Sequence, residues 1–390
     1  MKIVHLCLAA FFPDGYSYQE NMLPKFHKQL GHDVEVIASL QTFDENGKVV
    51  FMPSPKQYLN EYGIPVTRLA YKKPDGLYHK LKRYVGTSEA LEKAAPELLF
   101  IHGCQFRDMD KVVRYLKKHP NVRVFVDNHA DFSNSATNFL SREVLHKGFW
   151  RHSAHIVAPY TTRFYGVLPA RVDFLKNIYR LPAGKCELLV MGADDDKVEE
   201  AERNHWRERI RDKYGIGQDD FLVMTGGKID AWKTQTLLLM EAVRNISSPR
   251  LKLIVFGSVT PELKEKVQEL ADGTKVQYIG WIESEESYRY WIAADLAVFP
   301  GRHSVFWEQV AGMGIPMICK YWDGTTHVNV NDNAIFLMQD SVEEIAAAIG
   351  PLLDNPDKYR QMLARAQSEA RKQFSYRSIA QRAIEVRRQP

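Results

Sequence analysis

The sequence predicts an α/β protein of two consecutive domains, each with a parallel β-sheet that is covered by helices on both faces. Three observations predict this fold class. Short runs that are apolar throughout alternate with helical stretches, the alternation stops in the charge-rich stretch 194–220, and it then resumes. A length of 390 residues agrees with two domains, at about 100–200 residues for each.

The first domain is predicted from apolar runs that are short enough for buried strands. Helices are expected between them, for example at 110–118 and 170–179, where apolar residues recur at helical spacing. Strands are expected at 2–8, 33–38, 98–102, 122–126, 155–158 and 187–190.

The second domain repeats this order of elements. Helices are expected to begin at Thr234, Pro261 and Glu285 and to cover 306–313 and 342–353. Because the stretch 194–220 has no strand signal, we expect the first domain to end at residue 194 and the second to begin at residue 195. Strands are expected at 221–225, 251–256, 276–279, 296–299, 317–319 and 334–337.

Composition narrows the class of protein. With 45% hydrophobic and 26% charged residues the chain is an ordinary globular protein, and a formal charge of +4 gives no argument for nucleic acid as a partner. No run approaches the roughly 18 apolar residues of a membrane span, and residues 1–12 fit a first buried strand better than a signal peptide. The four cysteines lie far apart, so we expect reduced, buried thiols in a cytoplasmic protein and no zinc site.

Several catalytic motifs are absent. The sequence has no G-x-S-x-G, no G-x-x-x-x-G-K-[ST] and no complete G-x-G-x-x-G, so nothing supports an ATPase or a nicotinamide dehydrogenase. Two acidic clusters, 108–110 and 194–196, stand before expected helices. They are interpreted as helix caps in preference to a divalent-metal site, because helix starts commonly carry aspartate.

An anion site is predicted where the strand 221–225 meets the next helix. Gly226 and Gly227 allow close approach of the backbone to a phosphate, and Lys228, Lys233 and the helix start at Thr234 supply positive charge. From spacing alone, a solvated pair of lysines on a loop explains the pattern equally well.

A second candidate site follows the strand 296–299. Arg302, His303 and Glu308 lie on one loop and the start of the next helix, at a strand end where parallel sheets bind ligands. A carboxylate here suits recognition of sugar or ribose hydroxyls, and the alternative is a simple helix cap.

These pieces, in this order, resemble glycosyltransferase family 4, the retaining enzymes of the GT-B fold with two Rossmann-like domains that face a cleft. The resemblance covers nearly the whole chain. In the second domain, Gly227-Lys228 with Lys233 matches the family's phosphate clamp. The family's strand ends are matched by 255–258, 278–282 and 294–300, and its strand entry is matched by 314–318. In the first domain and at the C-terminus it rests on 14–16, 30–34, 126–129, 180–185, 191–194 and 374–376.

The resemblance implies an organisation and a set of roles. An acceptor-binding domain would comprise 1–194 with a returning helix at 374–390, and 195–373 would bind the nucleotide sugar. Lys228, Lys233 and Thr234 would neutralise the leaving diphosphate without a metal, and Glu308 would bind the ribose hydroxyls. The backbone of Ile282 would bind the base. Further sugar-donor contacts implied by the matched motifs are Gly15 near the β-phosphate, Gly227, Gly257, His303, Ser304, Val305 and Gln309.

His129 follows a strand at the place where the family has a histidine, and the resemblance implies that it contacts the sugar or orients the acceptor. The catalytic set is then His129, Lys228, Lys233 and Glu308. From the sequence alone, a structural histidine at a strand end remains the alternative for His129.

The chain also departs from the family pattern. The sugar-binding loop is shorter than usual and lacks the first of the family's two glutamates, with 301–304 in its place. The second glutamate corresponds to Gln309 or, after a shift by one residue, to Glu308. Lys228 stands where arginine is usual, which keeps the charge but not the bidentate geometry.

The predicted function is retaining transfer of a sugar from a nucleoside diphosphate sugar, UDP-sugar in preference to GDP-sugar, to a glycan or lipid-linked acceptor. The resemblance suggests a place in bacterial cell-surface polysaccharide or glycoconjugate synthesis. The alternatives are a GT-B epimerase or hydrolase of nucleotide sugars, and a peripheral membrane-binding protein without turnover. The basic, tyrosine-rich segment 71–84 is the candidate for contact with an anionic membrane at its cytoplasmic face, with a solvated surface loop as the alternative.

Overall fold

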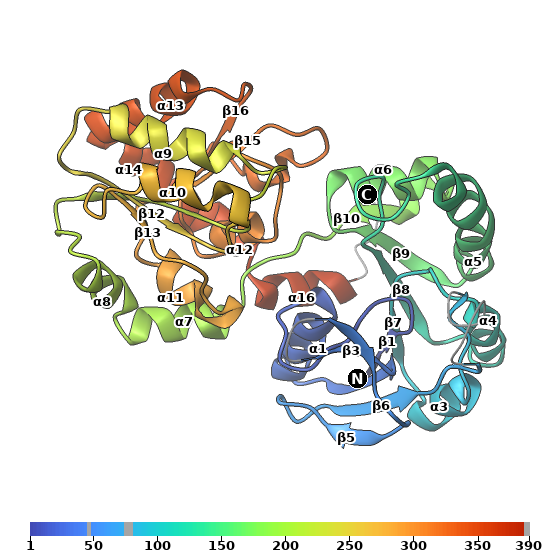
Figure 1. Cartoon of the computed structure of the whole chain (residues 1–390). Helices are drawn as coiled ribbons and strands as arrows, with labels where there is room; N and C mark the ends of the chain where they lie inside the picture. The colour runs from blue at the N-terminus through green and yellow to red at the C-terminus, as the bar shows by residue number, and fades with distance from the viewer. Residues whose placement is uncertain (45–47, 74–80, 386–390) are drawn as a thin grey trace. The chain divides into compact units, whose positions relative to one another are not determined.

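Two β-sheets, one in each part of the chain, organise the structure (Figure 1). The computed structural model describes residues 1–44, 48–73 and 81–385. Contacts within the chain divide it into unit 1, Met1–Val190 with Ile379–Pro390, and unit 2, Met191–Ser378. The predicted fold class, two parallel-sheet Rossmann-like domains, is confirmed.

Unit 1 contains an eight-stranded sheet in the order β10-β9-β8-β7-β1-β2-β6-β5. Its strands run parallel except for β5, which pairs antiparallel with β6, and a separate hairpin joins β3 and β4. The bounds are β1 Lys2–Cys7, β2 Asp33–Ser39, β3 Gln41–Phe43, β4 Val49–Phe51, β5 Gln57–Leu59, β6 Pro65–Leu69, β7 Leu98–His102, β8 Arg123–Asn128, β9 Thr161–Gly166 and β10 Cys186–Leu188.

The helices of unit 1 connect these strands. A π-helix covers Leu140–Trp150 and a 3₁₀ turn covers Ala183–Lys185. The chain returns to unit 1 within its last described helix, α16, Tyr376–Ile384. The other helices are α1 Gln19–Gln29, α3 Thr87–Ala94, α4 Met109–Lys118, α5 Arg151–Val157 and α6 Pro169–Asn177.

Unit 2 contains a six-stranded sheet in the order β13-β12-β11-β14-β15-β16, with every pair parallel. Helices lie on both sides of this sheet (Figure 1). The strands are β11 Phe221–Gly226, β12 Leu251–Phe256, β13 Val276–Tyr278, β14 Leu296–Phe299, β15 Met317–Lys320 and β16 Ala334–Leu337. The helices are α7 Asp195–Arg203, α8 Trp206–Lys213, α9 Gln235–Asn245, α10 Lys264–Leu270, α11 Ser287–Trp291, α12 Phe306–Gly312, α13 Val342–Asp354, α14 Pro356–Arg365 and α15 Arg371–Gln373. Short 3₁₀ turns at Pro261–Leu263, Ser284–Glu286 and Thr326–Val328 and a π-helix at Ala366–Ala370 complete the unit.

The central strands explain why the sequence folds this way. All residues of β7 and β14 are buried, so a run that is apolar on both faces lies between two helical layers. Each sheet carries its own core cluster of buried aliphatic and aromatic side chains. Removal of this apolar surface from water is the main favourable term, at roughly 25 cal/mol per Å².

One strand prediction of the first domain is wrong. Residues 155–158 belong to the end of α5 and its C-cap, because Ala154 and Val157 form the buried face of a helix. The strand lies a few residues later, at β9, where Arg163 interrupts the apolar pattern. The short strands β3 to β6 were not predicted.

The segment 71–84 is corrected in part. Residues 74–80 lie outside the described residues. Tyr84 of this segment is buried, and its hydroxyl donates to the Leu8 carbonyl at 2.6 Å. Lys82 is half-buried, and its ammonium donates to the Ala9 carbonyl. Burial lowers the pKa of Lys82 to about 8. The buried Tyr84 therefore cannot contact a membrane surface in this structure.

Two further expectations concern the whole chain. All four cysteines are buried and unpaired, as predicted. Within the described ranges, no helix has both the length and the apolar character that a bilayer span requires.

Candidate functional site

Three neighbouring strands of unit 2 end at one pocket of about 180 Å³, which we call the strand-end pocket. Its walls come from the end of β12, the residues that follow β11, β12 and β13, and the first residues of α11 and α12. Ligands of parallel sheets bind at this end of the strands. Residues that line the pocket include Gly227, Lys228, Gly257, Trp281, Ile282 and Phe306.

Gly227 and Gly257 bring two loops of this pocket into contact. Both have positive φ, 133° and 129°, and a Cβ on Gly257 would lie 1.9 Å from the Gly227 carbonyl oxygen. Their N–H groups are occupied, since Gly227 donates to the Phe256 carbonyl at 3.0 Å and Gly257 donates to the Gly280 carbonyl at 2.7 Å. The two glycines therefore shape the pocket wall and do not offer free N–H groups to a phosphate.

The predicted cations are only partly brought together. Lys228 lines the pocket and is 58% exposed, with its Nζ 3.3 Å from Asp230 Oδ2. Lys233 and Thr234 lie at the start of α9 and do not line this pocket. Thr234 occupies the N-cap position of α9, where it makes no side-chain cap hydrogen bond.

Aromatic side chains form a wall that sequence reasoning missed. Trp281 is 64% exposed and lines the pocket beside Ile282, and the rings of Phe256 and Phe306 lie 5.9 Å apart. A tryptophan three residues after the end of β13 was a usable signal, because ligands of parallel sheets bind at the strand ends. A flat aromatic face at this place can stack on a planar base.

Gln309 and Glu308 point to different surroundings. The Gln309 amide donates to Ser287 Oγ at 2.9 Å, and Ser287 lines the strand-end pocket. Glu308 has an exposed fraction of 0% and does not line that pocket. The predicted contact of Glu308 with ribose hydroxyls is therefore not supported, because the carboxylate is enclosed by protein.

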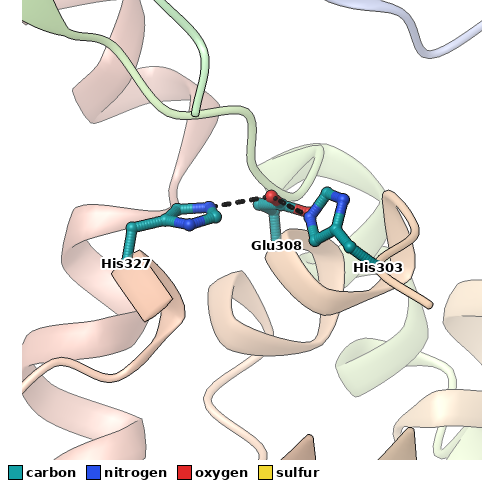
Figure 2. A group of neighbouring side chains, drawn as sticks. All are labelled: His303, Glu308 and His327. Carbon is teal, nitrogen blue, oxygen red and sulfur yellow. Dashed lines mark hydrogen bonds and ion pairs between the residues drawn. The ribbon is translucent and has the colours of Figure 1, made fainter. Parts of the chain in front are cut away.

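Glu308 is instead held between two histidines (Figure 2). Its Oε1 accepts from His303 Nε2 at 2.7 Å and from His327 Nε2 at 2.8 Å. Burial alone would raise the pKa of the Glu308 carboxyl, but the two histidines hold it well below its usual range. His303 thus belongs to this triad, while Ser304 and Val305 are loop residues at the start of α12, and none of the three lines the strand-end pocket.

The same triad is the group in the described part of the chain whose donor atoms could hold a metal ion. The three ligand atoms lie within 4.8 Å of one another. Two histidines and a carboxylate are a ligand set that suits several transition metals. In the hydrogen-bonded form both Nε2 atoms carry protons, so a metal could bind only after it displaced them.

Unit 1 has its own candidate site around His129, a pocket of about 390 Å³ that we call the histidine pocket. His129 Nε2 lies 3.5 Å from Asp127 Oδ2 and 3.8 Å from Glu20 Oε1. Burial acts to lower the pKa of His129, but these carboxylates raise it above its usual value. Polar and aromatic residues that line this pocket include Tyr18, Glu20, His102, Gln105, His129 and Asn134.

Gly15, predicted near the β-phosphate, lies in a loop before α1 with φ of 79°. Its N–H donates to Glu61 Oε1 at 2.9 Å. The glycine conformation is that of a tight loop, and the N–H is occupied by a side chain of the same unit.

Comparisons with known proteins concern the family and the fold. Residues 207–370 match the family model described as "Glycosyl transferases group 1". A search of curated proteins gives no match. The crystal structure of Anabaena Alr3699/HepE in complex with UDP is 15% identical over 98% of both chains, with a TM-score of 0.65.

Two further solved structures are similar over nearly the whole chain. Sucrose-phosphate synthase from Thermosynechococcus elongatus is 17% identical over 98% of this chain and 96% of its own, with a TM-score of 0.63. UDP-GlcNAc 2-epimerase from Neisseria meningitidis, bound to UDP-GlcNAc, is 11% identical over 99% of both chains, with a TM-score of 0.64. At these low sequence identities, the structural similarity shows a common fold.

Proposed function

Because residues 207–370 match the model of the group 1 glycosyltransferases and the chain has the GT-B fold, we propose that it is a member of this family and transfers a sugar from a UDP-sugar, with retention of configuration, to a glycan or lipid-linked acceptor. The observation that supports this proposal best is the strand-end pocket. It combines an exposed aromatic face at Trp281, an exposed cation at Lys228 and a polar wall at Ser287. These are the groups that a base, a diphosphate and a ribose require.

The sugar donor is proposed to bind along this pocket. The base lies against Trp281 and the backbone of Ile282, and the Gln309–Ser287 pair faces the ribose hydroxyls. Of the two candidates that the sequence left open for the family's second glutamate, we favour Gln309, because its amide donates to Ser287, which lines the pocket. An amide can donate a hydrogen bond to a hydroxyl and accept one from it, so a glutamine in place of the family's glutamate can still bind the ribose hydroxyls.

The chemical step needs stabilisation of a leaving diphosphate. Negative charge grows on the diphosphate as the glycosidic bond breaks, and Lys228, Lys233 and the N-terminus of α9 are proposed to stabilise it. This use of cationic side chains replaces the role that a divalent ion has in other transferases. His129 is proposed to orient the acceptor in unit 1, where burial lowers its pKa but Glu20 and Asp127 raise it above the usual value.

The choice of UDP is supported by two relatives. The Anabaena protein is in complex with UDP, and the Neisseria epimerase is bound to UDP-GlcNAc. The similarity to that epimerase supports an alternative function, that of an epimerase or hydrolase of nucleotide sugars. The acceptor and a place in surface polysaccharide or glycoconjugate synthesis remain part of the proposal.

Calorimetry followed by a turnover assay tests the proposal. UDP is expected to bind more tightly than GDP, and a UDP-sugar is expected to release UDP faster when a suitable acceptor glycan is present. Lys228→Ala should slow release, while Lys266→Ala, an exposed lysine of α10, should not. Release that never depends on an acceptor would favour the hydrolase, change of the sugar without release would favour the epimerase, and binding without turnover would favour a non-catalytic protein.

A further inference from the structure

Three histidines and one aspartate of unit 1 form a continuous hydrogen-bonded chain. His5 lies in β1, His102 ends β7 and Asp127 lies in β8. Because the sheet order is β8-β7-β1, these side chains come from three neighbouring strands. His27 of α1 continues the chain to the carbonyl group of Ala380 in α16.

Four contacts make up this chain, and its four side chains each have an exposed fraction of 0%. Bulk water therefore does not reach any of the bonds. In order, the contacts are Asp127 Oδ2 to His102 Nδ1 at 2.7 Å, His102 Nε2 to His5 Nδ1 at 2.9 Å, His5 Nε2 to His27 Nδ1 at 3.0 Å, and His27 Nε2 to the Ala380 carbonyl oxygen at 2.8 Å.

The number of protons follows from the two ends. A carbonyl oxygen and an ionised carboxylate can only accept, so each of the four contacts needs a proton from a histidine. Three neutral imidazoles carry three N–H protons in total. All four bonds can be made only when the chain holds one proton more, because an unmade bond between buried polar groups is costly.

We propose that these residues form a histidine relay (Asp127, His102, His5 and His27) that holds this additional proton, and that His102 carries it as an imidazolium against the Asp127 carboxylate. His5 and His27 are then neutral, each with its proton on Nε2. Their surroundings agree: burial and the neighbouring histidines lower the pKa of His5, and burial lowers the pKa of His27 to about 3. For Asp127, burial would raise the pKa, but His102 and His129 hold it below its usual range.

The additional proton can move along the relay without loss of a hydrogen bond. When the Nε2 proton of His102 passes to His5 Nδ1, the positive charge moves to His5 and the bond between them reverses its direction. A second transfer, from His5 Nε2 to His27 Nδ1, moves the charge to His27. The number of protons and of bonds stays constant at each step, so the relay links the charge at Asp127 to the α16 carbonyl.

The relay ends at the histidine pocket. Asp127 Oδ2 also lies 3.5 Å from His129 Nε2, so His102 acts as a positioning residue that keeps this carboxylate ionised and oriented. The other titratable and charged groups that face the relay and its pocket end are Glu20, Arg171, Cys7, Cys104 and His32. Glu20 adds negative charge beside His129, and Arg171 opposes it.

Nitrogen NMR of the full chain labelled with ¹⁵N-histidine tests the relay. We expect both nitrogens of His102 to be protonated from pH 6 to pH 9, whereas an ordinary histidine loses its charge near pH 6.5 within that range. His5 and His27 should each show one proton, on Nε2. A neutral His102 at pH 7, or its loss of a proton near pH 6.5, would overturn the proposal.

The variant Asp127→Asn sharpens the test, because it changes the number of protons that the three histidines must carry and leaves the four hydrogen bonds in place. The asparagine amide can donate to His102 Nδ1, so all four bonds persist with three neutral histidines. We expect His102 to become neutral with its proton on Nε2, and the pKa of His129 to fall. The matched control His119→Gln, at an exposed histidine bonded to Glu92, should change neither signal. If His102 stays doubly protonated in the folded Asp127→Asn variant, the proposed pairing of its positive charge with the Asp127 carboxylate is wrong. If this variant does not fold, the pH series on the unmodified chain tests the proposal by itself.

Discussion

Asp127 in unit 1 and Glu308 in unit 2 are both buried carboxylates between two histidines, yet their surroundings differ. Glu308 gives a single oxygen to both histidines, so its triad is closed. Asp127 gives Oδ2 to His102, which continues into further histidines, and the same oxygen faces His129 in a pocket.

This difference suggests a structural role for the Glu308 carboxylate and a functional role for the Asp127 carboxylate. Glu308 is enclosed by the loop after β14 and by His327, and its Oε1 accepts hydrogen bonds from both histidines. Asp127 is equally buried but reaches a side chain, His129, that is 29% exposed. We therefore expect loss of Glu308 to affect mainly folding, and loss of Asp127 to affect mainly the protonation of its neighbours.

The largest effect is expected for Glu308→Ala. Two histidine N–H groups would lose their buried partner, so the free energy of unfolding should fall by about 3–5 kcal/mol. Urea unfolding at neutral pH measures this change. Glu265→Ala, at an exposed glutamate of α10, is the control, and a loss of less than about 1 kcal/mol for Glu308→Ala would contradict the closed triad.

A second effect tests where unit 2 binds the nucleotide. Trp281→Ala should weaken UDP binding by about 1–3 kcal/mol, the range for loss of one base stacked on an aromatic ring. Trp232→Ala provides a matched control, because Trp232 is 71% exposed and does not line the strand-end pocket. Calorimetry measures both, and equal weakening by the two variants would move the base away from Trp281.

The third effect concerns the chemical step in the same unit. Lys228→Ala and Lys233→Ala should each lower kcat about tenfold, or about 1.4 kcal/mol in the barrier, the scale of one lost charge-stabilising group. Steady-state release of UDP from a UDP-sugar measures kcat. An unchanged kcat for Lys233→Ala would exclude this lysine from the diphosphate site. Lys233→Ala is the sharper of the two tests, because Lys233 does not line the strand-end pocket.

Sequence reasoning predicted the fold where local pattern decides it. The strands β7, β12, β14 and β16 have the predicted bounds, because each is a short and predominantly apolar run. The strand β9 was missed because Arg163 lies within it and is paired with Glu187 of the neighbouring strand, a contact that no local pattern reveals.

The sites were predictable only in part, for the same physical reason. Gly227, Lys228, Gly257 and Ile282 follow strand ends, and the sheet brings them to one pocket. The burial of Glu308 depends on His327, which is 19 positions away and on a different segment. For the relay, the available signal was a histidine within the otherwise apolar strand β1, since a polar side chain at a fully buried position needs a partner.

The smallest effect is the pH dependence of stability through His129. Its pKa is raised in the folded chain, so its ion pairs with Glu20 and Asp127 stabilise the fold fully below the unfolded value near 6.5 and are lost as the pH rises through the folded value. His129→Gln should therefore cost less than about 1 kcal/mol at pH 5.5, as for other partly exposed pairs, and nothing at pH 9. Urea unfolding of both proteins at the two pH values measures the difference, with His152→Gln on the helix α5 as control. A larger cost at pH 9 than at pH 5.5 would mean that His129 is neutral in the folded chain, and Asp127 would then differ from Glu308 only in its link to the relay.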